Sequence, residues 1–361
     1  MGSGTAEIKG LSGRLILSIS RFGRFRYAGA VKKALVTGGC GFLGSWIVRQ
    51  LCADGVKVRV LALPGEDREN VADLDVEVME GDVTVRADAE RAVAGMDTVF
   101  HAAAIYADWA PDPSKMYDVN VRGTFNMIEA SRRAGVERVI YTASMVSLGR
   151  PPAGQVGDET TAYEAWELDF PYSRSKFHSR ELAEYFADWD VDVRVVCPGV
   201  VLGPGDIRPT PSGKIIINSM SGGPGLYFDG GAAYVDVRDA AQVHILAAKK
   251  GKRGERYLAT GHNLTNRELV VAIDRVVGRK RRMMKLPVGV ARGVARAMES
   301  RASKSGKPPL LARDFFEYSL KPSFYSNDKA SRELGATFRP LDETIQDAVD
   351  YFKSRRARAA A

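Results

Sequence analysis

Apolar runs of strand length alternate with amphipathic stretches of helix length in the N-terminal half of the chain. An apolar run at 33–37 predicts a buried strand, apolar positions over 46–51 recur at helical spacing, and a second apolar run follows at 56–63. A further run of this kind lies at 193–197. Strands joined by helices pair in parallel, because the helix returns the chain to the start of the next strand. The pattern therefore predicts an α/β fold with a doubly wound parallel sheet.

A glycine-rich turn joins the first predicted strand to the first predicted helix, and it reads Gly38-Gly39-Cys40-Gly41-Phe42-Leu43-Gly44. In such a unit one glycine allows a sharp turn, the next lets a pyrophosphate approach the backbone, and the third lets the helix pack closely. The helix N-terminus then presents N–H groups to the anion. A tight turn without a ligand is the alternative. The strand–helix–strand context favours a Rossmann dinucleotide-binding unit, with the cofactor beside Gly38, Gly41, Phe42, Leu43 and Gly44.

Further motifs follow in order: Gly81-Asp82-Val83, His101-Ala102-Ala103-Ala104, Asn120-Val121-Arg122-Gly123-Thr124, Tyr141-Thr142-Ala143-Ser144, Tyr172-x-x-x-Lys176 and Pro198-Gly199-Val200. With the Thr-Gly-x-x-Gly-x-x-Gly turn, this set resembles the extended short-chain dehydrogenase/reductase superfamily over roughly residues 33–352. The resemblance implies NAD or NADP as cofactor. It also implies further cofactor contacts from Asp82, Val83, Ala102, Ala103, Ala104, Tyr172, Lys176, Pro198, Gly199 and Val200.

Tyr172 and Lys176 are four residues apart, which places them one turn apart on the same face of a helix. A free tyrosine has a pKa near ~10, and a neighbouring lysine cation favours the phenolate and lowers that pKa. A tyrosine of this kind can exchange a proton with a substrate hydroxyl. Ser144 can hold the same oxygen, and Asn120 is expected to support the site through a helix bend or a water beside Lys176. We therefore expect Ser144, Tyr172, Lys176 and Asn120 to form the catalytic group.

The end of the second predicted strand should distinguish NAD from NADP, since an acid there binds the ribose hydroxyl and an arginine binds the 2′-phosphate. Ala62 and Leu63 are neither. Glu66 and Asp67 would serve NAD, while Arg68 would serve NADP. The sequence leaves both cofactors open and favours NAD slightly, because two acids would repel a phosphate.

Four segments divide the chain. A basic extension covers 1–32, and the dinucleotide-binding domain covers 33–204. Residues 205–352 mainly bind and cover the substrate, with 226–258 returning to the sheet, and 353–361 form a basic tail.

The substrate side of the predicted site is apolar. Nucleotide-sugar members of the superfamily carry an arginine that binds pyrophosphate, but the matching stretch here, Gly230–Ala233, has no charge. Loops such as Trp109–Pro113 instead resemble the dihydroflavonol-reductase-like branch and hopanoid-associated sugar epimerases, and the glycine turn resembles 3β-hydroxysteroid dehydrogenases. The predicted substrate contacts are Tyr106, Trp109, Met145 and Arg208.

Composition narrows the class of protein. Of 361 residues, 45% are hydrophobic and 27% are charged, the profile of a soluble globular protein. No uncharged apolar stretch reaches the about 18 residues that a membrane span needs. The three cysteines fit neither a disulfide framework nor a zinc site. We therefore expect no metal and a cytoplasmic location.

The net charge of +8 comes from the two ends of the chain. Residues 1–33 hold seven basic residues and one acidic residue, while 353–361 hold four basic residues and no acidic residue. Charge of this kind predicts no nucleic-acid partner. The basic and apolar residues of 8–26 leave two interpretations, a mobile extension or peripheral contact with an anionic membrane. The oligomeric state stays open, and a homodimer is one alternative.

Three functions compete. The favoured one is an NAD(P)-dependent oxidoreductase that interconverts a hydroxyl and a ketone on a hydrophobic, steroid- or terpenoid-like small molecule. The second is a nucleotide-sugar epimerase or dehydratase of the same fold. The third is a non-catalytic sensor of NAD(P), which would not need Ser144, Tyr172 and Lys176 together.

Overall fold

The computed structural model describes residues 30–164, 170–222, 224–307, 309 and 311–360. Residues 31–361 form one compact unit. Residues 1–29, which make up most of the predicted basic extension, lie outside the described residues, so both interpretations of that segment stay predictions. Within the described ranges, no helix is long and apolar enough to cross a bilayer.

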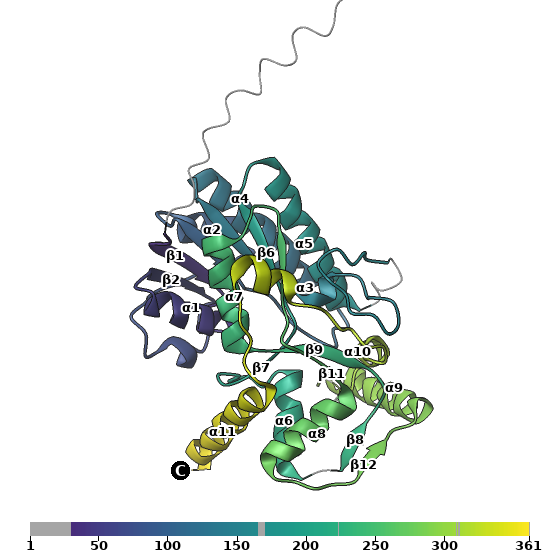
Figure 1. The fold of residues 1–361 in the computed structure, drawn as a ribbon. Helices are drawn as coiled ribbons and strands as arrows, with labels where there is room; N and C mark the ends of the chain where they lie inside the picture. Colours follow the sequence, from purple (N-terminus) through teal and green to yellow (C-terminus); the bar gives the residue numbers. More distant parts are fainter. Residues whose placement is uncertain (1–29, 165–169, 223, 308, 310, 361) are drawn as a thin grey trace, which may run out of the picture. The chain divides into compact units, whose positions relative to one another are not determined.

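A seven-stranded sheet lies at the centre of this unit, with the order β3-β2-β1-β4-β5-β6-β10 (Figure 1). Every neighbouring pair of strands is parallel. The strands are β1 (Lys33–Thr37), β2 (Lys57–Ala62), β3 (Glu77–Glu80), β4 (Thr98–His101), β5 (Arg138–Thr142), β6 (Val193–Pro198) and β10 (Arg256–Ala259).

Successive side chains of a strand point to opposite faces of the sheet, so apolar side chains on both faces need to be covered. Helices pack on both faces. Ala34 and Val36 belong to a core that includes α1 and α7, while Leu35 belongs to a second core that includes α2, α4 and α5. The predicted α/β fold with a doubly wound parallel sheet is therefore confirmed. The helices are α1 (Phe42–Ala53), α2 (Arg86–Val93), α3 (Ser114–Tyr117), α4 (Thr124–Ala134), α5 (Pro171–Trp189) and α7 (Val237–Lys250).

The strand order reverses between β1 and β4, since the chain first moves outward to β3 and then returns to the other side of β1. Ligands of open α/β sheets bind at such a point, outside the carboxyl ends of the strands. The glycine turn follows β1, the alanines 102–104 follow β4, and Ser144 follows β5. The fold therefore brings three of the predicted motifs to one edge of the sheet.

The remaining elements build a smaller part around two further sheets (Figure 1). One sheet holds β11 (His262–Thr265), β9 (Gly231–Asp236) and β7 (Val200–Leu202), and the other pairs β12 (Met283–Lys285) with β8 (Gly225–Tyr227). The helices here are α6 (Pro211–Ser221), α8 (Asn266–Val277), α9 (Val288–Ser305), α10 (Arg313–Ser319) and α11 (Leu341–Ala360).

Two details differ from the expectation. Within the segment 226–258, β9 pairs with β7 and β11, and only β10 at its end joins the central sheet, beside β6. The basic tail at 353–361 continues α11 as far as Ala360. The domain boundaries themselves stay predictions.

Candidate active site

The glycine turn after β1 is closed around its own backbone. Gly38 has φ of 68°, and a Cβ there would lie 2.9 Å from the Cα of Ala103. A Cβ on Gly44 would overlap the carbonyl oxygen of Gly38. Both positions need glycine for the turn itself, because left-handed backbone and close backbone approach exclude a side chain.

Gly41 differs, because only one backbone atom crowds the space beside it. Its backbone is extended, and a Cβ there would meet only the carbonyl oxygen of Gly38, at 3.1 Å. Gly41 is the N-cap of α1 and offers no side-chain cap to the first turn, which Phe42 and Leu43 begin. A helix N-terminus with free approach is a binding place for a phosphate. These residues therefore fit the pyrophosphate of a dinucleotide.

The other predicted cofactor residues surround the same edge of the sheet. Asp82 and Val83 follow β3, and the Oδ1 atom of Asp82 accepts a hydrogen bond from the Thr84 N–H at 2.8 Å. Pro198 ends β6, and Gly199 lies so close to the next sheet that a Cβ would be 2.5 Å from the carbonyl oxygen of Ala233. The remaining residues of this set are Ala102, Ala103 and Ala104 after β4, and Val200 at the start of β7.

Ser144 and Tyr172 come together from two elements. Ser144 follows β5, and its Oγ accepts a hydrogen bond from the Val146 N–H at 3.4 Å. Tyr172 lies in the first turn of α5, which Pro171 opens. Burial raises the pKa of Tyr172 to about 12, although the neighbouring Ser144 side chain acts in the opposite direction. The phenol is therefore protonated at neutral pH and is placed to donate a proton.

Lys176 is buried one turn further along α5. Its Nζ donates to the carbonyl oxygen of Thr142 at 2.7 Å and to the Tyr141 hydroxyl at 3.4 Å. Burial lowers the pKa of Lys176 to about 7. We expected the lysine to lower the pKa of Tyr172, but in this structure its hydrogen bonds go to β5. The ammonium group thus joins α5 to the strand that carries Ser144.

Asn120 lies in a π-helical turn, Asp118–Gly123, between α3 and α4. Its Oδ1 accepts from the Ile105 N–H at 2.7 Å, and its Nδ2 donates to the Ile105 carbonyl at 3.0 Å and to the Ser175 Oγ at 2.9 Å. Both ends of the amide are therefore used. Asn120 fixes the chain leaving β4 to the residue beside Lys176, and a helical irregularity does lie at this position.

His101 at the end of β4 is neutral, and the hydrogen-bond network fixes its tautomer. Thr124 donates to the Asn120 carbonyl at 2.6 Å, so its hydroxyl accepts from Nε2 of His101 at 3.0 Å. Thr37 accepts from the Ala103 N–H at 3.2 Å and donates to Nδ1 at 2.7 Å. Burial lowers the pKa of His101 to about 3. His101 therefore supports the cofactor turn and is not a proton carrier.

Two buried neutral histidines predict a loss of stability in mild acid. Burial lowers the pKa of His244 to about 4 and that of His101 to about 3, whereas an unfolded histidine titrates near ~6.5. Between pH 6.5 and 5 the unfolded chain takes up protons that the folded chain does not. The free energy of unfolding should fall with pH there, by up to about 1.4 kcal/mol per histidine and pH unit.

Urea unfolding across this range measures the slope. The variant His244→Asn should lose about half of the slope, since one of two titrating groups is removed. A flat profile in the wild type would contradict the assignment.

Aromatic side chains surround Tyr172 from distant parts of the chain. The ring of Tyr106 meets it edge to face at 4.6 Å, and the ring of Phe170 lies 6.0 Å away. Phe170 in turn packs on Phe315 and Tyr318 of α10, at 5.8 and 5.7 Å. We call these four residues the aromatic cluster. The sequence predicted only Tyr106 of them, because nothing in a local pattern connects α10 with a tyrosine far earlier in the chain.

The other predicted substrate residues take different places. Met145 is buried directly after Ser144, and Trp109 is partly exposed in the loop before α3. Arg208 lies 3.3 Å from Glu66 in the loop after β2, where the ribose of a dinucleotide would bind. The geometry thus places Arg208 nearer the predicted cofactor-ribose region.

Among the residues that the structure describes, neither a metal-binding cluster nor a reactive thiol at Cys40 or Cys197 is found. No set of three or more His, Cys, Asp or Glu side chains there could hold a metal ion. Burial raises the pKa of Cys40 to about 11 and that of Cys197 to about 12, so both thiols are protonated and poor nucleophiles at neutral pH.

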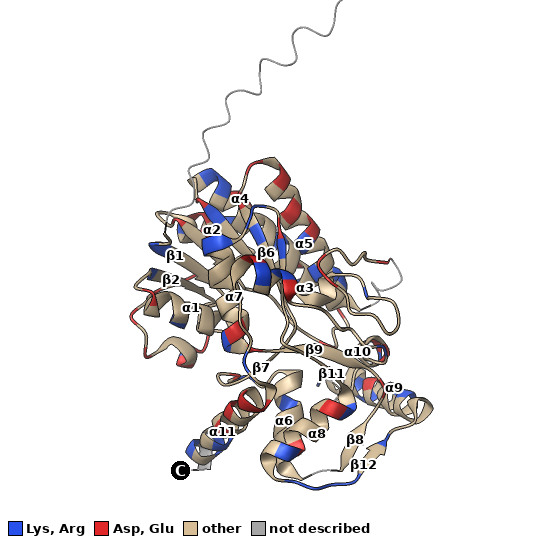
Figure 2. Cartoon of the chain, viewed as in Figure 1, with Lys and Arg blue, Asp and Glu red and all other residues tan. Residues whose placement is uncertain are grey.

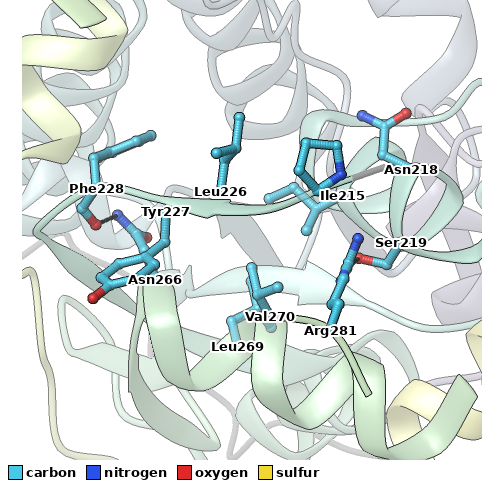
Figure 3. A pocket seen from close by; sticks show the side chains of 11 residues that line it. Ile215, Asn218, Ser219, Leu226, Tyr227, Phe228, Asn266, Leu269, Val270 and Arg281 are labelled. Atoms are coloured by element: carbon cyan, nitrogen blue, oxygen red, sulfur yellow. Dashed lines mark hydrogen bonds between the residues drawn. The ribbon is translucent and has the colours of Figure 1, made fainter. Parts of the chain in front are cut away.

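A separate pocket of about 280 Å³ lies in the smaller part (Figure 3). It is lined by side chains of α6, β8 and α8, which are largely apolar, with Arg281 at one end. None of the predicted site residues lines it.

Known proteins resemble this chain in sequence and in fold. The profile of the NAD dependent epimerase/dehydratase family matches residues 34–259. A protein named putative dihydroflavonol 4-reductase from Synechocystis is 31% identical and covers 88% of this chain and 94% of its own. Sterol demethylase protein B from Methylococcus capsulatus is also 31% identical, over 89% and 98% of the two chains.

A solved structure, that of gox2253, is 35% identical with a TM-score of 0.80, and it covers 90% of this chain and 98% of that one. The range that the family profile matches, residues 34–259, spans the glycine turn, Ser144, Tyr172 and Lys176. The resemblance expected from the motifs is therefore confirmed, and NAD(P) is the cofactor. The chain belongs to the NAD dependent epimerase/dehydratase family and is an NAD(P)-dependent oxidoreductase.

Proposed function

We propose that the protein interconverts a ketone and a hydroxyl on a hydrophobic, polycyclic small molecule of steroid or terpenoid type. The observation that carries this proposal is the aromatic cluster, in which Tyr106 and Phe170 pack on Tyr172 while Phe315 and Tyr318 pack on Phe170. Apolar walls with few polar groups suit a fused-ring substrate. Relatives named for dihydroflavonol and sterol chemistry support the same class.

The chemistry follows from the groups at the end of β5 and the start of α5. The reduced dinucleotide supplies a hydride when it is bound. Tyr172 donates its phenol proton to the carbonyl oxygen as that oxygen gains negative charge, so the product is an alcohol. Ser144, whose side chain lies beside Tyr172, holds the same oxygen. In the oxidation direction the phenol first loses its proton to solvent, and the resulting phenolate of Tyr172 takes the hydroxyl proton of the substrate.

Lys176 and Asn120 position this pair. Lys176 joins α5 to β5 through Thr142, and Asn120 fixes Ser175 to the chain after β4. Neither side chain has to move for Tyr172 to reach a substrate, because both are already held by hydrogen bonds inside the protein.

A nucleotide-sugar substrate is the second candidate, since the family profile itself is named for epimerases and dehydratases. Its pyrophosphate would need cationic partners, because an unpaired buried charge is costly. A Cβ on Gly231 would lie 2.5 Å from the Leu264 carbonyl oxygen, so this position holds no side chain. Arg238 pairs with Asp236 and Asp347, at 2.7 Å each. These contacts favour the apolar substrate.

NAD is the proposed cofactor rather than NADP. Glu66 accepts from the Leu63 N–H at 3.0 Å and pairs with Arg208 at 3.3 Å, while Arg68 pairs with Glu80. Both arginines near the end of β2 are thus neutralised by carboxylates. A 2′-phosphate would meet the acidic Glu66 without a free cation to compensate.

The test compares turnover of two substrate panels with NADH and NADPH, and with the oxidised forms for the reverse direction. One panel holds 3-hydroxysteroids, 3-ketosteroids and dihydroflavonols, and the other holds UDP-glucose, UDP-galactose and dTDP-glucose. We expect conversion of the apolar panel with NAD(H), and specificity constants at least about tenfold higher than for nucleotide sugars. Efficient conversion of a nucleotide sugar with an inert apolar panel would establish the second candidate instead.

A further inference from the structure

The segment 279–307 is strongly basic. It holds ten lysines and arginines and a single acid, Glu299. The segment leads from the end of α8 through β12 into α9, and Figure 2 shows basic residues along the chain before and through β12. The excess positive charge of the described protein is therefore concentrated in one segment of the smaller part.

Most of these basic side chains serve no pair within the fold. Arg281 binds Asp274, Lys285 binds Asp229 and Arg292 binds Glu317. Six exposed lysines and arginines of this described segment have no ion pair or hydrogen bond: Lys280, Arg282, Arg296, Arg301, Lys304 and Lys307. Five of these cations are free to meet an external anion, while Arg296 also lies near Glu317 and helps to lower the pKa of that carboxyl.

Exposed apolar side chains lie among the cations. Leu226 and Met284 are register partners in the β8–β12 pair, so they share a face of that sheet, and they are 45% and 44% exposed. Val290 and Val294 of α9 are 53% and 40% exposed and stand one turn apart. α9 rests on its neighbours through small residues, Ala291, Ala295 and Ala302. The valines therefore form an outward stripe that no described part of the chain covers.

We propose that the segment 279–307, together with Leu226, is a docking surface for an anionic lipid bilayer. Free cations attract acidic headgroups, and apolar side chains between them can enter the boundary with the acyl chains. A nucleic acid would use the cations but would give the outward leucine, methionine and valines nothing to bind. The combination of unpaired cations with exposed apolar side chains along this segment thus favours a membrane.

The pocket of the smaller part lies at this surface, because Leu226 and Arg281 line it (Figure 3). A lipid chain or a membrane-dissolved molecule that enters it would meet Ile215, Leu269 and Val270. The membrane proposal does not depend on the proposed substrate, since vesicle binding is measured without turnover.

The test is co-sedimentation of the full-length protein with vesicles of equal parts phosphatidylcholine and phosphatidylglycerol, and with vesicles of phosphatidylcholine alone. We expect binding to the anionic vesicles and at least about tenfold weaker binding to the neutral ones. Two variants separate the contributions. Lys280→Gln with Arg282→Gln, Lys304→Gln and Lys307→Gln removes charge, and Val290→Ser with Val294→Ser removes apolar area.

Each variant should lower the partition coefficient on anionic vesicles at least about fivefold. Lys57→Gln with Lys115→Gln, and Trp189→Ser, change exposed residues elsewhere and should leave it within about twofold. A third variant with Arg14, Arg21, Arg24 and Arg26 changed to Gln tests the N-terminal segment. Loss of binding in this variant alone, with both surface variants unchanged, would overturn the proposal. So would failure of the wild type to bind, or loss with the charge variant but not the valine variant.

Discussion

Tyr172→Phe is expected to lower kcat by about 1000-fold while the protein still binds its dinucleotide. The change removes one hydroxyl, the proton donor to the substrate oxygen, and general acid catalysis of this kind contributes about 10²–10⁴-fold. The ring keeps its contacts with Tyr106 and Phe170, so packing is preserved. Steady-state rates on a converted ketone give kcat, and fluorescence titration with NADH gives the cofactor affinity.

Tyr106→Phe is the matched control, because it removes the same hydroxyl from the ring that meets Tyr172 at 4.6 Å. We expect this variant to keep kcat within about threefold, since no step uses its hydroxyl. If Tyr172→Phe retained most of the wild-type rate, Tyr172 would not be the proton donor. If Tyr106→Phe lost as much activity as Tyr172→Phe, the assignment of Tyr172 as the proton donor would be wrong.

The alternation of strands and helices could be predicted from sequence, because it rests on local periodicity. The apolar residues of β1 and the apolar face of α1 can be recognised from the sequence, and steric contacts explain the glycine turn between them. The pairing of later strands could not be predicted in this way. β9 and β10 are both short and mostly buried, yet one joins the small sheet and the other the central sheet.

The active site could likewise be predicted from the sequence only in part. Tyr172 and Lys176 could be placed from their spacing, and Ser144 from its motif, since each lies at the start of a helix or the end of a strand. The partners of Lys176 could not, because Thr142 and Tyr141 reach it only after β5 and α5 have packed. Phe315 and Tyr318 carried no local signal at all. They belong to α10, and only tertiary structure brings that helix to Phe170.

Gly41→Val is expected to weaken dinucleotide binding by about 100-fold or more without unfolding the protein. The position is extended rather than left-handed, so its backbone accepts any residue, and the space beside it is open except for the carbonyl oxygen of Gly38. That open space is where the pyrophosphate approaches the backbone, and a branched side chain would fill it. Titration with NADH measures the affinity, and thermal unfolding measures the stability.

Gly44→Ala separates loss of the ligand site from loss of the turn. A Cβ on Gly44 would overlap the carbonyl oxygen of Gly38, so this smaller change should lower Tm as well as affinity. Gly41→Val should cost about 1–2 kcal/mol of stability, since valine is a poorer helix N-cap than glycine and its Cβ would press on the Gly38 carbonyl oxygen. The smaller substitution, Gly44→Ala, should therefore destabilise the protein more than the larger one, Gly41→Val. Unchanged NADH affinity in Gly41→Val would mean that the cofactor phosphates bind elsewhere than at the start of α1.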